Sequence, residues 1–114
     1  MKIWLDDVRP APEGWNHCKK AEEAFWYIMN AESCLGDRVT ELSFDHDLGA
    51  IHTGYDLARW IEALAYNNRI PAITWKIHSA NPVGRKNIEM AMQNADRYWE
   101  QHAESTRISE DQRS

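Results

Sequence analysis

Groups that can bind a cation or transfer a proton gather in three short segments, each directly after an apolar stretch of the chain. Carboxylate oxygens are the ligands that Mg²⁺, Mn²⁺ and Ca²⁺ prefer in proteins. An imidazole can accept or donate a proton near neutral pH, and hydroxyl or amide groups can bind phosphate oxygens. The segments contain Asp6 and Asp7, then Asp45, His46 and Asp47, and finally His78, Ser79 and Asn81.

Alternating strands and helices are predicted to position these segments. Apolar residues recur at helical spacing between the predicted strands. Thr53 and Asp56 have the form of a capping box at a helix start, and Asn81 can cap a helix whose first residue is Pro82. The sequence predicts strands at residues 2–5, 15–18, 40–44 and 71–79, and helices at residues 19–33, from residue 53, and from residue 82 to about 102.

Strands joined by single helices predict an α/β fold, a small doubly wound parallel sheet. Pro10, Pro12 and Gly14 exclude a regular helix from the first connection, and no fifth strand is visible after the last helix. The strand at 71–79 is therefore expected at an edge, where Lys76 would discourage association with another sheet. Ligands of such sheets bind at the carboxyl ends of the strands, so the three polar segments should meet at one rim.

The composition predicts one domain over residues 1–102, followed by a polar, flexible tail at 103–114. A formal net charge of −5 and an acidic pI argue against binding to duplex DNA or to a membrane. Cys18 and Cys34 lack the spacing of metal or redox sites, and nothing resembles a signal peptide or a membrane span. We therefore expect a cytoplasmic protein.

Carboxylates crowded at one rim would repel one another and raise at least one carboxyl pKa unless a cation lies among them. The sequence therefore predicts a Mg²⁺ or Mn²⁺ site formed by Asp6, Asp7 and Asp45, with Asp47 either as an additional ligand or as a residue that supports the ligands from behind. A simpler interpretation stays open, in which Asp6, Asp7 and Asp47 only form turns.

Opposite these acids, the predicted helix start at Asn81 offers free amide groups and a dipole that can hold an anion. A glycine there would permit close approach, and nearby arginines could contact a phosphate. Asn81 could equally serve only as a helix cap. The predicted phosphate- or substrate-binding residues are Arg9, Thr53, Gly54, Ser79, Asn81, Gly84 and Arg85.

An acidic pair after the first strand, an aspartate after the third and a hydroxyl residue after the fourth resemble the response-regulator receiver domain. The resemblance implies a flavodoxin-like fold, with Asp45 as phospho-acceptor and Ser79 as switch hydroxyl. The chain departs from that pattern: "VRPAPEG" replaces the first helix, and the fifth strand with its lysine is not visible.

A second resemblance is more specific. The segments "LDDVRPAPEGW", "FDHDLG", "TGYDLARWI" and "HSANPVGRKN" are similar to signatures of the cyclic-phosphate processing receiver domain family. The resemblance covers the chain from residue 1 to about 95. This resemblance implies action on cyclic phosphates in RNA repair or nucleotide signalling.

The main hypothesis is a metal-dependent phosphoesterase that acts on a cyclic nucleotide or on an RNA-terminal cyclic phosphate. His46 and His78 would be general acid and base in either order, and Asp45 could instead be a covalent nucleophile. An alternative is a module that binds a cyclic nucleotide without cleaving it. A further alternative is an atypical phospho-acceptor receiver. The edge strand would permit a homodimer.

Overall fold

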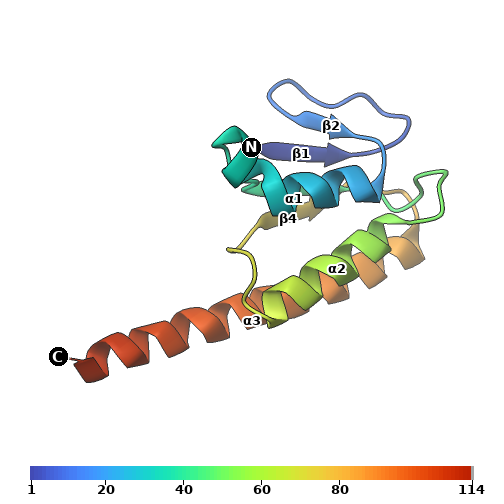
Figure 1. The fold of residues 1–114 in the computed structure, drawn as a ribbon. Coiled ribbons are helices and arrows are strands. Elements are labelled where there is room, and N and C mark those ends of the chain that lie inside the picture. The colour runs from blue at the N-terminus through green and yellow to red at the C-terminus, as the bar shows by residue number, and fades with distance from the viewer. Residues whose placement is uncertain (114) are drawn as a thin grey trace.

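A computed structural model describes the backbone of residues 1–113 and the side chains of residues 1–106. The described residues form four strands and three helices that alternate along the chain after the first two strands (Figure 1). The strands are β1 (Lys2–Leu5), β2 (Asn16–Cys18), β3 (Glu41–Phe44) and β4 (Thr74–Ile77), and the helices are α1 (Ala21–Leu35), α2 (Gly54–Tyr66) and α3 (Pro82–Arg113).

All strand pairs are parallel, and the order across the sheet is β2-β1-β3-β4. This confirms the predicted α/β fold, including the place of β4 at an edge. The described residues contain no fifth strand and no helix in the first connection, as expected. Because β1 and β3 are neighbours in the sheet, the residues that follow them come together at one rim.

The three helices form one layer on one face of the sheet. α1 contacts α2, and α2 packs along α3 (Figure 1). The strands present Ile3, Leu5, Leu42 and Phe44 to this layer, and all four side chains are fully buried. The chain leaves β1 toward β2 but later proceeds in the opposite direction to β3 and β4. Because crossovers between parallel strands are right-handed, the connection from β1 to β2 lies on the face opposite the helices. The sheet is therefore doubly wound, although the connection on that second face contains no helix.

Two tryptophans cover part of the face that lacks helices. Trp15, at the end of the first connection, meets Trp4 edge to face, with 6.1 Å between the ring centroids. The ammonium groups of Lys2 and Lys76 lie 5.5 and 4.7 Å from the centre of the Trp15 ring. Trp15 of the first connection thus covers this face in place of a helix, by packing against Trp4 of β1 and under the ammonium groups of Lys2 and Lys76.

The helix starts follow the predicted caps. The Asp56 backbone N–H donates to Thr53 Oγ1 (3.2 Å), and the Thr53 N–H donates to Asp56 Oδ2 (2.9 Å), so the capping box is confirmed. Asn81 caps α3, because its Oδ1 accepts from the N–H of Gly84 (2.9 Å). Gly36 ends α1 in the left-handed region, with φ of 68°.

Some boundaries differ from the prediction. β4 is shorter than residues 71–79, and α1 extends to Leu35. The expectation that the last helix ends near His102 was wrong, because α3 continues to Arg113. No glycine or proline occurs between residues 85 and 113, so no residue there interrupts the helix. Whether residues 103–114 are flexible stays a prediction.

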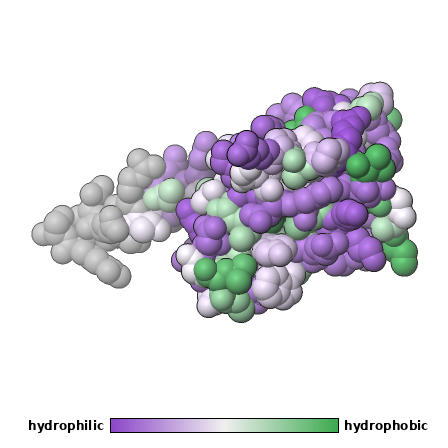
Figure 2. Space-filling view, turned by 90° about the horizontal axis from the view of Figure 1, so that it is seen from above, coloured by the Kyte–Doolittle hydropathy of each residue, from purple (hydrophilic) through white to green (hydrophobic). Residues whose placement is uncertain are grey.

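The surface seen from above is largely hydrophilic, and hydrophobic residues form small, separate patches on it (Figure 2). Among the residues that the structure describes, no helix combines the length and the apolar character that a membrane span requires.

Candidate metal centre

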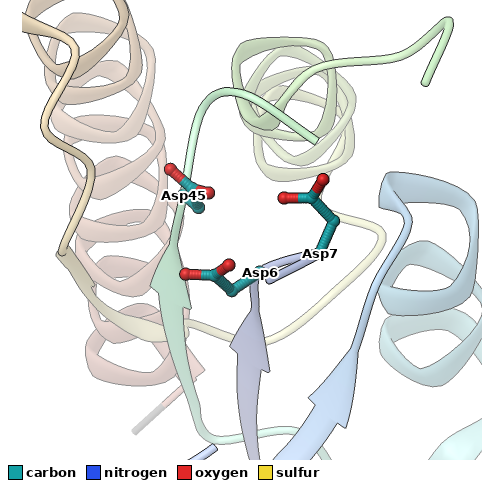
Figure 3. A group of neighbouring side chains, drawn as sticks. All are labelled: Asp6, Asp7 and Asp45. Carbon is teal, nitrogen blue, oxygen red and sulfur yellow. The ribbon is translucent and has the colours of Figure 1, made fainter. Parts of the chain in front are cut away.

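Three carboxylates meet where β1 and β3 end. Asp6 and Asp7 directly follow β1, and Asp45 directly follows β3. Each of the three offers an oxygen that lies within 4.8 Å of the oxygens offered by the other two. The carboxylates face a common space at this rim (Figure 3). Such a group of hard oxygen donors could bind a divalent metal ion.

Asp6 is buried, with only 1% of its surface exposed, and hydrogen bonds hold its carboxylate in place. Its Oδ1 accepts hydrogen bonds from the backbone N–H groups of Val8 and Arg9, both at 2.8 Å. Burial by itself would raise the pKa of Asp6, but these hydrogen bonds and one from His78 outweigh it and leave the pKa lowered. Asp6 is therefore a fixed, ionised carboxylate at neutral pH.

The pKa of Asp45 is shifted in the opposite direction, upward. Burial raises the pKa of Asp45, and the negative charge of Asp6 raises it further. The backbone N–H of His46, 2.8 Å from Asp45 Oδ1, and the Ser79 side chain oppose the shift only in part. A cation bound between Asp6 and Asp45 would relieve the repulsion, so the electrostatics fit a metal site.

The three carboxylates line an open cleft of about 390 Å³. This is near the lower end of the volumes typical of small-molecule sites. Asn81 Nδ2 donates to Asp47 Oδ2 across 3.2 Å, which joins the β3–α2 loop to the start of α3. Seven residues predicted for the site line this cleft: Asp6, Asp7, Arg9, Asp45, Asp47, Ser79 and Asn81.

Neither candidate imidazole lines the cleft. The His46 ring packs against Gly84 at the start of α3, where an added Cβ would overlap it, and His46 Nδ1 is buried without a hydrogen-bond partner. His78 lies behind Asp6, with Nε2 3.1 Å from Asp6 Oδ2. Burial lowers the pKa of His78, and Asp6 opposes this shift in part. Their roles as general acid and base stay predictions.

The remaining predicted binding residues make contacts within the protein. One Nη of Arg85 donates to the carbonyl oxygens of Ile77 (3.1 Å) and Ser79 (3.0 Å). Thr53 caps α2, and Gly54 is buried so close to Asp45 that an added Cβ would overlap the Asp45 carbonyl oxygen. These residues and Gly84 therefore shape the rim from outside the cleft.

Sequence reasoning missed one residue beside the carboxylates and one residue that contacts His78. Gly49 lines the cleft in the left-handed region (φ 61°), and an added Cβ would lie 3.0 Å from Asp7 Oδ2. Ser43 is fully buried behind the site, and its Oγ is 2.8 Å from His78 Nδ1. The sequence feature that could have indicated Ser43 is its hydroxyl group, the one polar side chain among residues 42–44 of an apolar predicted strand.

A parallel sheet with acids after β1 and β3 and a hydroxyl residue after β4 defines a reduced receiver-like protein. The family model for the cyclic-phosphate processing receiver domain matches residues 1–94. The chain belongs to this family. Searches of curated proteins and of solved structures found no match.

Proposed function

We propose that this protein is a divalent-metal-dependent phosphoesterase that opens cyclic phosphates on nucleotides or RNA ends. The observation that carries the proposal is the convergence of Asp6, Asp7 and Asp45 within 4.8 Å, in a cleft that also contains cationic and hydrogen-bonding side chains. Membership of the cyclic-phosphate processing receiver family supports the choice of substrate class.

Asp6, Asp7 and Asp45 would hold Mg²⁺ or Mn²⁺. When bound, the cation would polarise the phosphoryl group and lower the pKa of a coordinated water. Asp47 lies in the same cleft but outside the cluster of three, and its hydrogen bond to Asn81 orients the amide at the start of α3. We therefore assign Asp47 to the substrate side of the cleft.

Arg9, Ser79 and Asn81 would bind the phosphate oxygens, because all three line the cleft beside the carboxylates. One Nη of Arg9 donates to the carbonyl oxygen of His78 (3.0 Å), which holds the exposed guanidinium at the rim. In the reaction, water adds to phosphorus, one of the two ester P–O bonds of the ring breaks, and the released ester oxygen takes up a proton.

A panel of cyclic phosphates tests the proposal. The protein is incubated with 2′,3′-cyclic mononucleotides, RNA ending in a 2′,3′-cyclic phosphate, 3′,5′-cyclic mononucleotides and cyclic oligonucleotides, with Mn²⁺, Mg²⁺ or a chelator. We expect one class to gain the mass of water only with metal, and Asp45→Asn to abolish this gain. Glu22→Gln, an exposed change on α1, is the matched control and should retain full turnover. No turnover of any class with metal bound would overturn the proposal.

The second candidate is a module that binds a cyclic nucleotide without cleaving it. The absence of both candidate imidazoles from the cleft lining favours this alternative, because binding does not need a proton-transfer group. Intact ligands across the panel, with saturable binding of one of them by calorimetry, would establish it.

A further inference from the structure

We propose that His78 is a positioning residue: held by Ser43 and Trp4, it fixes the Asp6 carboxylate in the orientation that binds the cation. The inference rests on the metal site of the proposed function, but it does not depend on which phosphate is processed or on whether cleavage occurs.

His78 restrains the oxygen of Asp6 that the backbone leaves free. Asp6 Oδ1 already accepts two backbone hydrogen bonds, from Val8 and Arg9. The second oxygen, Oδ2, lies 3.1 Å from His78 Nε2. With donors on both oxygens, the carboxylate cannot rotate freely, and its remaining lone pairs keep a fixed direction.

Asp6 sets which ring nitrogen of His78 carries the proton, and Ser43 complements that tautomer. An ionised carboxylate only accepts hydrogen bonds, so neutral His78 donates to Asp6 from Nε2–H. Nδ1 is then the acceptor, and the Ser43 hydroxyl, 2.8 Å away, is its donor. Ser43 is fully buried and has no solvent to bond instead. The order Ser43, His78, Asp6 therefore forms a directed chain of hydrogen bonds toward the cluster.

Trp4 fixes the plane of the imidazole. Its ring stacks on His78 with 3.7 Å between centroids and 5° between planes. Trp4 Nε1 also donates to the Arg9 carbonyl oxygen (3.3 Å), while Arg9 donates to the His78 carbonyl oxygen (3.0 Å). These contacts fix the ring, the turn that holds Asp6 and the cleft residue Arg9 relative to one another.

Groups that hydrogen-bond to metal ligands typically contribute a factor of about 10–100 to metal affinity. Mn²⁺ affinity, measured by electron paramagnetic resonance on the purified protein, should therefore fall about 10- to 100-fold in His78→Leu. His78→Gln should recover most of the affinity, because its amide can donate from the position of Nε2. Ser43→Ala should weaken binding by a smaller factor, because Nδ1 loses its donor. His52→Gln is the matched control. His52 lies in the β3–α2 loop outside the cleft, so this variant should bind Mn²⁺ as the wild type does.

Equal loss in His78→Gln and His78→Leu would show that packing rather than the donor matters, and would overturn the inference. Wild-type affinity in a folded His78→Leu would overturn it as well. If His78→Leu fails to fold, unchanged affinity in Ser43→Ala is the contradicting result. Mn²⁺ binding that follows the expected order without any turnover would support the inference while rejecting the phosphoesterase. Absence of Mn²⁺ binding in the wild type would overturn both.

Discussion

Asp45 carries a charge that the metal-free fold disfavours, because it is partly buried beside ionised Asp6 and its pKa is raised. The unfolded chain releases this proton at lower pH than the folded protein does. Ionisation of Asp45 therefore lowers the free energy of unfolding of the wild type. This loss, which a variant with a neutral side chain at position 45 does not share, develops as pH rises from the unfolded carboxyl pKa of about 3.9 through the raised folded pKa.

Asp45→Asn should accordingly stabilise the metal-free protein at pH 7, because the neutral amide is not repelled by the negative charge of Asp6. The gain in stability should vanish toward pH 3.5, because Asp45 is largely protonated in both the folded and the unfolded state below the unfolded carboxyl pKa of about 3.9. Urea unfolding in the presence of a chelator at both pH values measures it, with Glu22→Gln as control. A variant no more stable than the wild type at pH 7 would show that Asp45 is not under electrostatic strain.

At the scale of elements, α2 begins directly against the end of β3. Gly54 is buried there, and its Cα faces the Asp45 carbonyl group. Gly54→Ala should destabilise the protein by about 2–3 kcal/mol, because the added methyl group would overlap backbone atoms of Asp45, which cannot rotate away as a side chain could. Gly14→Ala is the matched control: open space surrounds Gly14, so only its positive φ of 85° opposes the change, at a cost of about 1 kcal/mol. Thermal unfolding of the two variants compares them, and equal losses would contradict the close approach.

The first connection covers the helix-free face of the sheet through Trp15. Trp15→Ala should lower the free energy of unfolding by about 2 kcal/mol, less than for a fully buried tryptophan because Trp15 remains partly exposed. Trp26→Ala on α1, where the side chain is 46% exposed, should cost much less. Denaturant unfolding measures both. Similar values for the two variants would mean that Trp15 does not contribute to the covering of this face.

Local chemistry explains which elements were predictable. Helical spacing, the Thr53–Asp56 capping box and the Asn81–Pro82 helix start are encoded within a few residues, and all three match the structure. The carboxylate rim also followed from the sequence, because parallel strands bring their carboxyl ends together.

The positions of the two histidines were not predictable in the same way. His46 turns toward α3 because Gly84, distant in sequence, leaves room for its ring. His78 follows Ile77 and points to the opposite face, where Trp4 and Ser43 lie. Strand alternation indicates which residues of one strand share a face, but the register that joins Trp4, Ser43 and His78 depends on tertiary pairing.

At the scale of the whole molecule, α3 extends the packed unit beyond the residues that match the family. The match ends at residue 94, yet Trp99 is only 8% exposed and its Nε1 donates to the Ile70 carbonyl oxygen (3.1 Å). His102 Nε2 lies 2.9 Å from the Ala65 carbonyl oxygen at the end of α2. The packing of α3 against the end of α2 and the segment that follows it therefore reaches His102.

Truncation tests this boundary. A chain of residues 1–102 should keep the stability of the full chain to within about 0.5 kcal/mol, because most surface positions contribute little. A chain of residues 1–94 should lose about 3–5 kcal/mol, the usual cost of removing a buried tryptophan. Thermal unfolding by circular dichroism compares the chains. Equal stability of the two truncated chains would contradict the packing of α3 against α2.

One titration tests whether the three carboxylates support the opening of cyclic phosphates through a bound metal ion. Mn²⁺ is added to chelator-treated protein while turnover of the best cyclic substrate and Mn²⁺ binding are followed in parallel. We expect turnover to start from zero, to rise in proportion to the fraction of protein with Mn²⁺ bound, and to be absent in Asp45→Asn. Turnover that is unchanged by the chelator, or a fully occupied site without turnover, would contradict it.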